Sequence, residues 1–249
     1  MGFVSLLGHF LVGVGPPLVF FVLFISRRSF VVLVTLASAF YYLVVFLLTA
    51  SLLRGLVPLD PSPGPHAGAL AAAVAIETAA RYLLWVLHRM TTNTLADTAR
   101  RTGKSWSPSD ALHVSVGFGF GQGAAHAVFF FLAALPLLAG EATYYVDRCP
   151  QMSYFLTLAL LELGFSALHT AGTVVFFSGL SAGEGGLRVW GPPLLHLAAA
   201  MCTLASFREG GCAGSVPAVG ALAAGTCAWA VRVAVAEASR RPGLIRTER

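Results

Sequence analysis

The sequence contains very little charge. Asp, Glu, Lys and Arg together make up 11% of its 249 residues, whereas hydrophobic residues make up 57%, and this balance excludes an ordinary soluble domain. The single lysine, Lys104, lies outside the apolar stretches, which excludes a retinal bound as a buried Schiff base. The aspartates also lie outside these stretches: Asp60, Asp97, Asp110 and Asp147. The chain alone is therefore not an intramembrane aspartyl protease, which needs two carboxylates at bilayer depth.

Seven long apolar stretches occupy most of the chain. Each can cross a hydrocarbon core about 30 Å thick at about 1.5 Å per helical residue. They cover residues 3–25, 29–53, 67–87, 113–138, 153–177, 187–207 and 213–235. These stretches predict an all-α polytopic membrane protein, with one seven-helix transmembrane domain over residues 1–238 and a short basic tail over 239–249.

Proline marks three irregular places, two within these stretches and one between them. Pro16 and Pro17 lie in the middle of the first one, where two missing N–H donors predict a kink or a break. The segment 58–65 is too rich in proline to be helical and is expected to be a loop. Pro192 and Pro193 interrupt the sixth stretch early, which makes it the weakest of the seven.

The basic residues indicate how the chain crosses the membrane. One set of loops holds most of them: Arg27, Arg28, Arg89, Arg100, Arg101, Lys104, Arg188 and four arginines of the tail. The other set holds only Arg54, Arg148 and Arg208. Because cytosolic loops carry the excess of Lys and Arg, the first set is expected in the cytosol. Seven spans then place the N-terminus outside and the C-terminus in the cytosol, and the basic excess indicates topology rather than nucleic-acid binding.

The four cysteines show no CxxC or Cys/His spacing, so the sequence suggests no zinc site, and no other metal or cofactor is expected. Cys149 and Cys212 both fall on the predicted outer side. An oxidising compartment would allow them to form a disulfide. With no distance known between them, two free thiols are the favoured interpretation.

Small residues recur through the fourth stretch in two series. Gly117, Gly121 and Ala125 form one series, and Gly119, Gly123 and Ala127 form the other. Residues two apart point about 200° apart around a helix, so the two series lie on nearly opposite faces. Glycine is frequent in membrane helices, which is the simpler explanation. The double series favours a helix that packs closely between two neighbours, in this chain or in a partner.

Ionisable residues at bilayer depth are costly, and each is a candidate functional residue. Glu77 and Arg81 are four apart on one helix and are expected to form a structural ion pair. His169 and His196 lie at similar depths, about 12–14 Å from the cytosolic edge, on helices expected to be adjacent and antiparallel. They can share hydrogen bonds, line a polar cavity or bind a metal. A structural or partner-facing polar pair is the favoured interpretation, because two histidines without a third ligand are a weak metal signal. Glu162 shares a helix face with His169 and is a candidate for an unpaired acid in such a cavity.

In combination, these features resemble the anterior-pharynx-defective (Aph) subunit of γ-secretase over nearly the whole chain. The segments that carry the resemblance are GPPLVFF from Gly15, FVVLVTLASAFYYLVVFLLTAS from Phe30, the Glu77–Arg81 pair, the small-residue series, SYFLTLALLELGFSALHTAGTVVFF from Ser153 and HLAAAMCTL from His196. The chain departs from the family pattern at Ala125, where the family has glycine. Glu162 matches no residue of that pattern.

The resemblance implies a non-catalytic scaffold that holds a presenilin-like catalytic subunit and a nicastrin-like subunit together with a small presenilin-enhancer-like subunit. It implies an activator of endopeptidase activity on type I membrane proteins, including Notch-type processing. The expected location is the endoplasmic reticulum, Golgi, other endomembranes and plasma membrane. It assigns Gly117, Gly121 and Ala125 to assembly, and His169 and His196 to the presenilin interaction. A small membrane enzyme or transporter with a His- and Glu-lined midplane cavity is the alternative.

Overall fold

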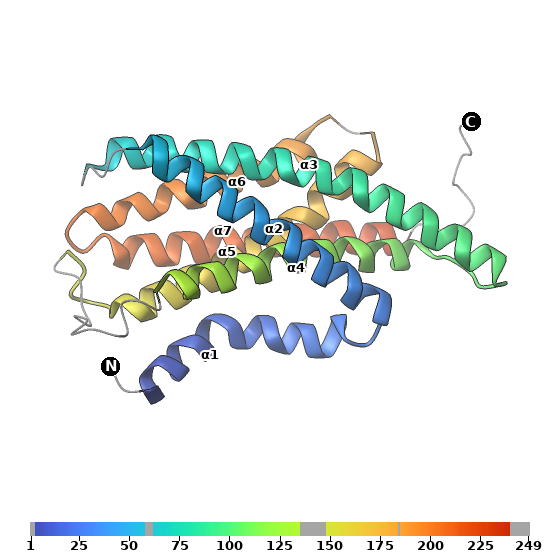
Figure 1. Ribbon diagram of the computed structural model, residues 1–249, viewed down its shortest axis with the longest axis horizontal. Coiled ribbons are helices and arrows are strands. Elements are labelled where there is room, and N and C mark those ends of the chain that lie inside the picture. Colours follow the sequence, from blue (N-terminus) through green and yellow to red (C-terminus); the bar gives the residue numbers. More distant parts are fainter. Residues whose placement is uncertain (1–2, 58–61, 135–147, 184, 240–249) are drawn as a thin grey trace.

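The computed structural model describes residues 3–57, 62–134, 148–183 and 185–239. Over these residues the chain forms seven α-helices and no β-strand (Figure 1). The α-helices are α1 (Phe3–Phe20), α2 (Ser29–Leu56), α3 (Pro63–Arg101), α4 (Pro108–Ala134), α5 (Tyr154–Ser181), α6 (Leu187–Thr203) and α7 (Cys212–Ala238). Six helical segments of the described residues are long and apolar enough to cross a membrane. The predicted all-α membrane protein is thus confirmed, while the positions of its termini relative to the membrane stay a prediction.

The longest helix, α3, differs most from its predicted bounds. It has 39 residues and begins at Pro63, so Pro63 and Pro65, which were expected in a loop, are helical. Proline is well tolerated in the first helical turn, where its missing N–H would have no helical partner. At its other end α3 continues 14 residues past the predicted end. The rest of that predicted loop, 58–61, lies outside the described residues, as do residues 135–138 of the fourth stretch and 240–249 of the tail.

The proline pairs do not break their helices. Helix α1 continues through Pro16 and Pro17 and is followed by a π-helical turn, η1 (Phe21–Ile25). Helix α6 continues through Pro192 and Pro193 to Thr203 and ends in a 3₁₀ turn, η3 (Leu204–Phe207). Each proline removes only one backbone donor, and membrane helices tolerate this where the neighbouring turns stay intact. Of the kink or break predicted for the first helix, the break is therefore wrong, and the kink stays a prediction.

Helix α5 forms the centre of the bundle, and α1 lies at one edge of it (Figure 1). Seventeen of the 28 residues of α5 are buried, and the helix contacts α1, α4, α6 and α7. Helix α4 packs between α5 and α2, and α3 packs against α2, α4 and α6. The glycine-rich helix α4 is therefore the middle one of three layers, with α2 on one side and α5 on the other.

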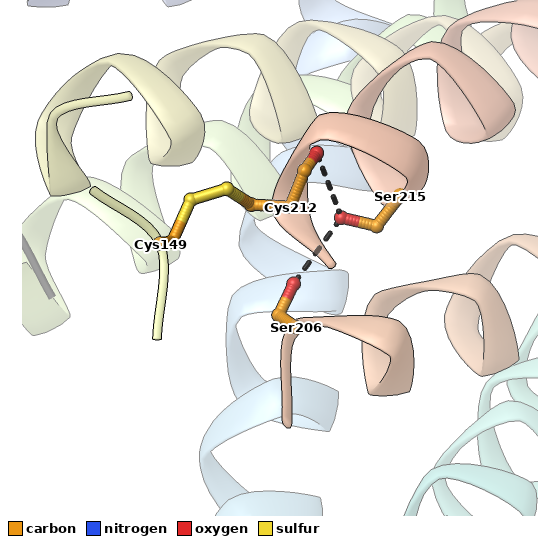
Figure 2. The surroundings of a disulfide bond; sticks show 4 residues. All are labelled: Cys149, Ser206, Cys212 and Ser215. Atoms are coloured by element: carbon orange, nitrogen blue, oxygen red, sulfur yellow. Dashed lines mark hydrogen bonds between the residues drawn. A yellow bond between two sulfur atoms is a disulfide. The ribbon is translucent and has the colours of Figure 1, made fainter. Parts of the chain in front are cut away.

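A disulfide joins Cys149 and Cys212 at one end of the bundle (Figure 2). Their Cα atoms are 6.0 Å apart although 63 residues separate them in the sequence. The amide of Gly210 also donates to the carbonyl of Arg148, at 2.7 Å. The favoured interpretation of two free thiols is therefore wrong, because the antiparallel course of the helices brings the segment before α5 next to the start of α7.

At the opposite end, an ion pair ties the start of α4 to the turn before α2. Arg28 donates to Asp110 at 2.5 Å, and Asp110 accepts from the amide and hydroxyl of Ser107. The hydroxyl of Ser107 accepts in return from the amide of Asp110. This reciprocal pattern is a capping box, and it starts α4 at Pro108, five residues before the predicted start.

Partial burial alone would raise the pKa of Asp110. The hydrogen bonds from Ser107 and Arg28 outweigh burial, so the pKa of Asp110 is lowered from its ordinary value. The charged form of this carboxylate therefore stabilises the joint between α2 and α4.

Candidate functional site: a glycine-packed, polar helix core

One face of α4 lies directly against α2. A Cβ atom at Gly117 would lie 2.9 Å from Cγ1 of Val31, and one at Gly121 would collide with the carbonyl of Thr35 and lie 2.7 Å from Cβ of Ser38. The close approach lets Thr35 and Ser38 donate to the α4 carbonyls of Gly117 and Phe118, at 3.2 and 2.6 Å. At Gly121 a side chain would push the two backbones apart, whereas at Gly117 it would displace the side chain of Val31.

The opposite face of α4 lies against α5 in the same way. A Cβ atom at Gly119 would lie 2.6 Å from the carbonyl oxygen of Thr170, and one at Gly123 would lie 2.6 Å from that of Ser166. Both series of small residues therefore pack inside this chain. Ala125 ends the first series and is 5% exposed, within a core cluster that includes Tyr42 and Phe46.

Arg81 is the centre of a buried polar network. Its side chain is among the largest fully buried ones and reaches from α3 to both α4 and α5. Nε donates to the amide oxygen of Gln122 at 3.2 Å, and one guanidinium NH₂ group lies 3.3 Å from Nδ1 of His169. Gln122 also accepts from the hydroxyl of Thr173, at 2.9 Å. One arginine thus joins three helices through hydrogen bonds in the buried interior.

The expected ion pair between Glu77 and Arg81 is absent among the described contacts within 4 Å. Instead, Oε2 of Glu77 lies 4.0 Å from Nε2 of His169 and 3.9 Å from Nδ1 of His196. Residues four apart on a helix can pair with each other, but here the side chain of Arg81 reaches Gln122 and His169 instead. Instead of pairing with each other, the two residues of α3 contact different side chains on the neighbouring helices.

His169 and His196 meet inside the bundle, as their similar depths indicated. Their ring centroids are 4.6 Å apart with the rings nearly perpendicular, and the residues are 1% and 6% exposed. They do not face a surface that a partner could touch. With Glu77 they provide two imidazoles and a carboxylate whose ligand atoms all lie within 4.8 Å of one another. This third candidate ligand comes from α3 and was missed in the sequence.

Glu162 is not the unpaired acid that the sequence suggested. It is fully buried, and its Oε2 lies 3.3 Å from Nδ1 of His126 on α4. The ring of His126 is in turn 4.7 Å from that of His169. Gln122, which is also fully buried, was overlooked. The sequence did contain a sign of its role, because Gln122 is the only amide side chain within the glycine-rich stretch 113–138.

A separate apolar groove of about 600 Å³ opens between α1 and the bundle. Pro16, Pro17, Phe20 and Phe24 of α1 and η1 form one wall. Its floor carries small side chains from α5 and α7, namely Ser166, Ala167, Thr170, Ala171, Ala230 and Ala234. The groove includes none of the buried ionisable residues.

Together these observations define a polytopic helical membrane protein in which the glycines of α4 and a cluster of buried ionisable groups face the interior. A comparison with known proteins identifies its family, because the Aph-1 protein family matches residues 4–237. The chain belongs to the Aph-1 family. It is 34% identical over 213 residues to the gamma-secretase subunit APH1-like of Arabidopsis thaliana, with 85% of each chain covered. It is 28% identical over 164 residues to the gamma-secretase subunit Aph-1 of Drosophila melanogaster, with 66% of each covered.

Proposed function

We propose that the chain is a non-catalytic subunit of a γ-secretase complex. It would stabilise a presenilin-like catalytic subunit and a nicastrin-like subunit, with a small presenilin-enhancer-like subunit, and so support intramembrane proteolysis that includes Notch-type processing. The observation that carries the proposal is the family match across residues 4–237. Relatives named as γ-secretase subunits in a plant and an insect support it.

The arrangement of the acids supports a non-catalytic role. Glu77 and Glu162 are buried, and each faces histidines of this chain. Asp97 and Asp110, the aspartates within the described residues, lie near the ends of α3 and α4, where they pair with Arg100 and Arg28. No pair of these carboxylates shares a proton at a surface that a substrate could reach, as aspartyl proteolysis would require.

The outer surface offers apolar helix faces to partners and lipid. Helix α1 exposes residues such as Phe10 and Leu18, the turn η1 exposes Phe24, and α2 exposes Leu33, Phe40 and Leu48. The groove beside α1 has a floor of small residues, which suits close contact with a transmembrane helix. We infer that partner subunits dock on these outer faces, whereas Gly117, Gly121, Gly119 and Gly123 act on assembly indirectly by holding α2, α4 and α5 together.

The proposed topology follows from the two ends of the bundle. The end with Arg27, Arg28, Arg100, Arg101 and Lys104 carries the basic excess and would therefore lie in the cytosol. The disulfide lies at the opposite end, which would then face an oxidising compartment. The N-terminus would lie outside and the C-terminus in the cytosol. The chain would reside in the endoplasmic reticulum, Golgi, other endomembranes and plasma membrane.

Affinity purification from membranes in mild detergent tests the proposal. The tagged chain is expected to recover presenilin-like and nicastrin-like proteins. Val231→Trp fills the groove from an exposed position, and Val235→Trp is the matched control, equally exposed one turn further along α7 and outside the groove lining. Val231→Trp is expected to recover less of the presenilin-like or the nicastrin-like protein than the parent chain does. Val235→Trp is expected to recover as much of both as the parent chain. Recovery of the folded chain without these partners would contradict the proposal.

The alternative, a small enzyme or transporter using His169, His196 and Glu162, is less well supported. Such activity needs a path from the surface to the polar residues, and these are buried and absent from the groove lining. A pH-dependent activity of the isolated chain, lost in His169→Ala while the complex still assembled, would favour it.

A further inference from the structure

Three polar atoms face one another in the bundle without a hydrogen-bond partner. They are Oε2 of Glu77, Nε2 of His169 and Nδ1 of His196, from α3, α5 and α6, and all three are buried. Their separations of 3.9 and 4.0 Å from Glu77 are too long for direct hydrogen bonds. An unsatisfied buried polar atom costs about 1–3 kcal/mol, so three converging ones point to a small polar species held between them.

Arg81 determines which atoms of this site donate. A guanidinium group has only donors, and one of its NH₂ groups lies 3.3 Å from Nδ1 of His169. Nδ1 must therefore accept, and in the neutral ring the hydrogen is carried by Nε2. The His169 ring thus presents an N–H donor to the gap, opposite the carboxylate oxygen of Glu77, which is an acceptor.

We propose that Glu77, His169 and His196 form a hydration site that holds one water molecule and links three helices, with Arg81 fixing the direction of its hydrogen bonds. The water accepts from Nε2–H of His169. It donates one hydrogen to Oε2 of Glu77 and the other to Nδ1 of His196, whose own hydrogen is then on Nε2. This assignment satisfies all three atoms with a single molecule, and three hydrogen bonds are typical of a buried water.

The same contacts favour water over zinc, although two histidines and a glutamate are a ligand set that zinc uses. Tetrahedral bonds of about 2.1 Å need ligand atoms about 3.4 Å apart, shorter than the separations of 3.9 and 4.0 Å here. Zinc would also need the lone pair of Nε2, which carries the hydrogen. A ligating histidine normally donates through its other nitrogen, but that nitrogen faces the donors of Arg81.

A density map of the full chain in its complex, at a resolution that shows ordered water, tests the proposal. A peak about 2.8 Å from each of the three atoms is expected. A peak about 2.1 Å from them, or no peak, would overturn it. A zinc assay gives an independent readout: the purified chain, incubated with equimolar zinc sulfate and desalted, is expected to retain no stoichiometric zinc. One zinc per chain that is lost in Glu77→Gln would overturn the proposal.

Two substitutions at one position separate hydration from packing. His196→Asn keeps an acceptor near the position of Nδ1, and His196→Leu keeps the volume but removes the acceptor. The density peak is expected to persist in the Asn variant and to disappear in the Leu variant. A peak that is unchanged in His196→Leu would show that this ring does not hold the water, and the assignment would fail.

Discussion

Helices α5 and α1 are both apolar enough to cross a membrane, yet the bundle uses them in opposite ways. Over the most apolar window of each segment, mean hydropathy is 1.4 for α5 and 2.0 for the segment Leu7–Ile25 of α1 and η1. The buried share of the same windows is 72% and 11%. The more apolar helix is therefore the more exposed one, which is the reverse of a soluble protein.

The difference follows from the solvent. An apolar side chain gains little when it leaves lipid for a protein interior, so close packing and polar contacts decide which helices are central. Helix α5 meets the glycines of α4 through Ser166 and Thr170 and contributes Glu162 and His169 to the polar network. Helix α1 carries no such groups among its exposed residues Leu11, Leu18 and Val19. Substitutions at the centre should therefore affect folding far more than substitutions at the edge.

The largest effect is expected for Arg81→Met. Removing this cation takes the hydrogen bonds from Gln122 and His169 and the favourable field of the guanidinium from the buried carboxylate of Glu77, which should lower the free energy of unfolding by about 3–5 kcal/mol. Thermal unfolding of the purified chain in nanodiscs measures the loss. Leu18→Ala, on the exposed face of α1, is the control and should change stability by less than about 0.5 kcal/mol. Equal losses in the two variants would remove the distinction between centre and edge.

The disulfide gives the next largest effect. It fastens the segment before the central helix α5 to α7, and replacing both Cys149 and Cys212 by Ala should cost about 2–4 kcal/mol. The free cysteines Cys202 and Cys227, replaced together by Ala, are the matched control. A reducing agent should lower the unfolding temperature of the parent chain and of the control pair but not of the first variant. If reduction leaves the parent unchanged, the disulfide contributes nothing to stability.

A bulky residue in α4, the layer between α2 and α5, should lower the free energy of unfolding by about 1–3 kcal/mol. At Gly121 a larger side chain would meet the backbone of α2, which cannot move away as a flexible side chain could. Gly121→Leu should therefore unfold at a lower temperature even without partner subunits. Gly8→Leu in α1, where a Cβ would meet nothing within 4 Å, should unfold like the parent chain. Loss of partners by Gly121→Leu with unchanged stability would instead place this glycine at an interface between subunits.

The architecture could be predicted from the sequence because it depends on repeating patterns. Long apolar stretches gave the helices, and the alternation at Gly117, Gly119, Gly121 and Gly123 indicated two close neighbours of one helix. Which neighbours these were could not be read, because both faces of a small-residue helix look the same in one dimension. The structure shows that they are α2 and α5 of the same chain.

The polar contacts were harder to predict because they depend on helix rotation. Glu77 and Arg81 have the spacing of an ion pair, but rotation of α3 turns both into the bundle, toward His169, His196 and Gln122. Helix ends were also missed where their signals are local. The start of α4 was placed five residues late because the capping box was not recognised.

The smallest expected effect on stability comes from this capping box, at the joint between α2 and α4. The pKa of Asp110 is lowered in the folded chain, so its contribution to stability is present above the ordinary aspartate pKa and is lost as the pH falls through the lowered value. The pair is partly exposed, which limits the effect to about 1 kcal/mol. Asp110→Asn should lower the unfolding temperature slightly at neutral pH, and the difference should shrink below about pH 4. Asp97→Asn is the control, because Asp97 is exposed and its pairing with Arg100 lies within α3. A difference for Asp110→Asn that stays constant down to strongly acidic pH would show that the side chain acts through its shape or hydrogen bonds and not through its charge.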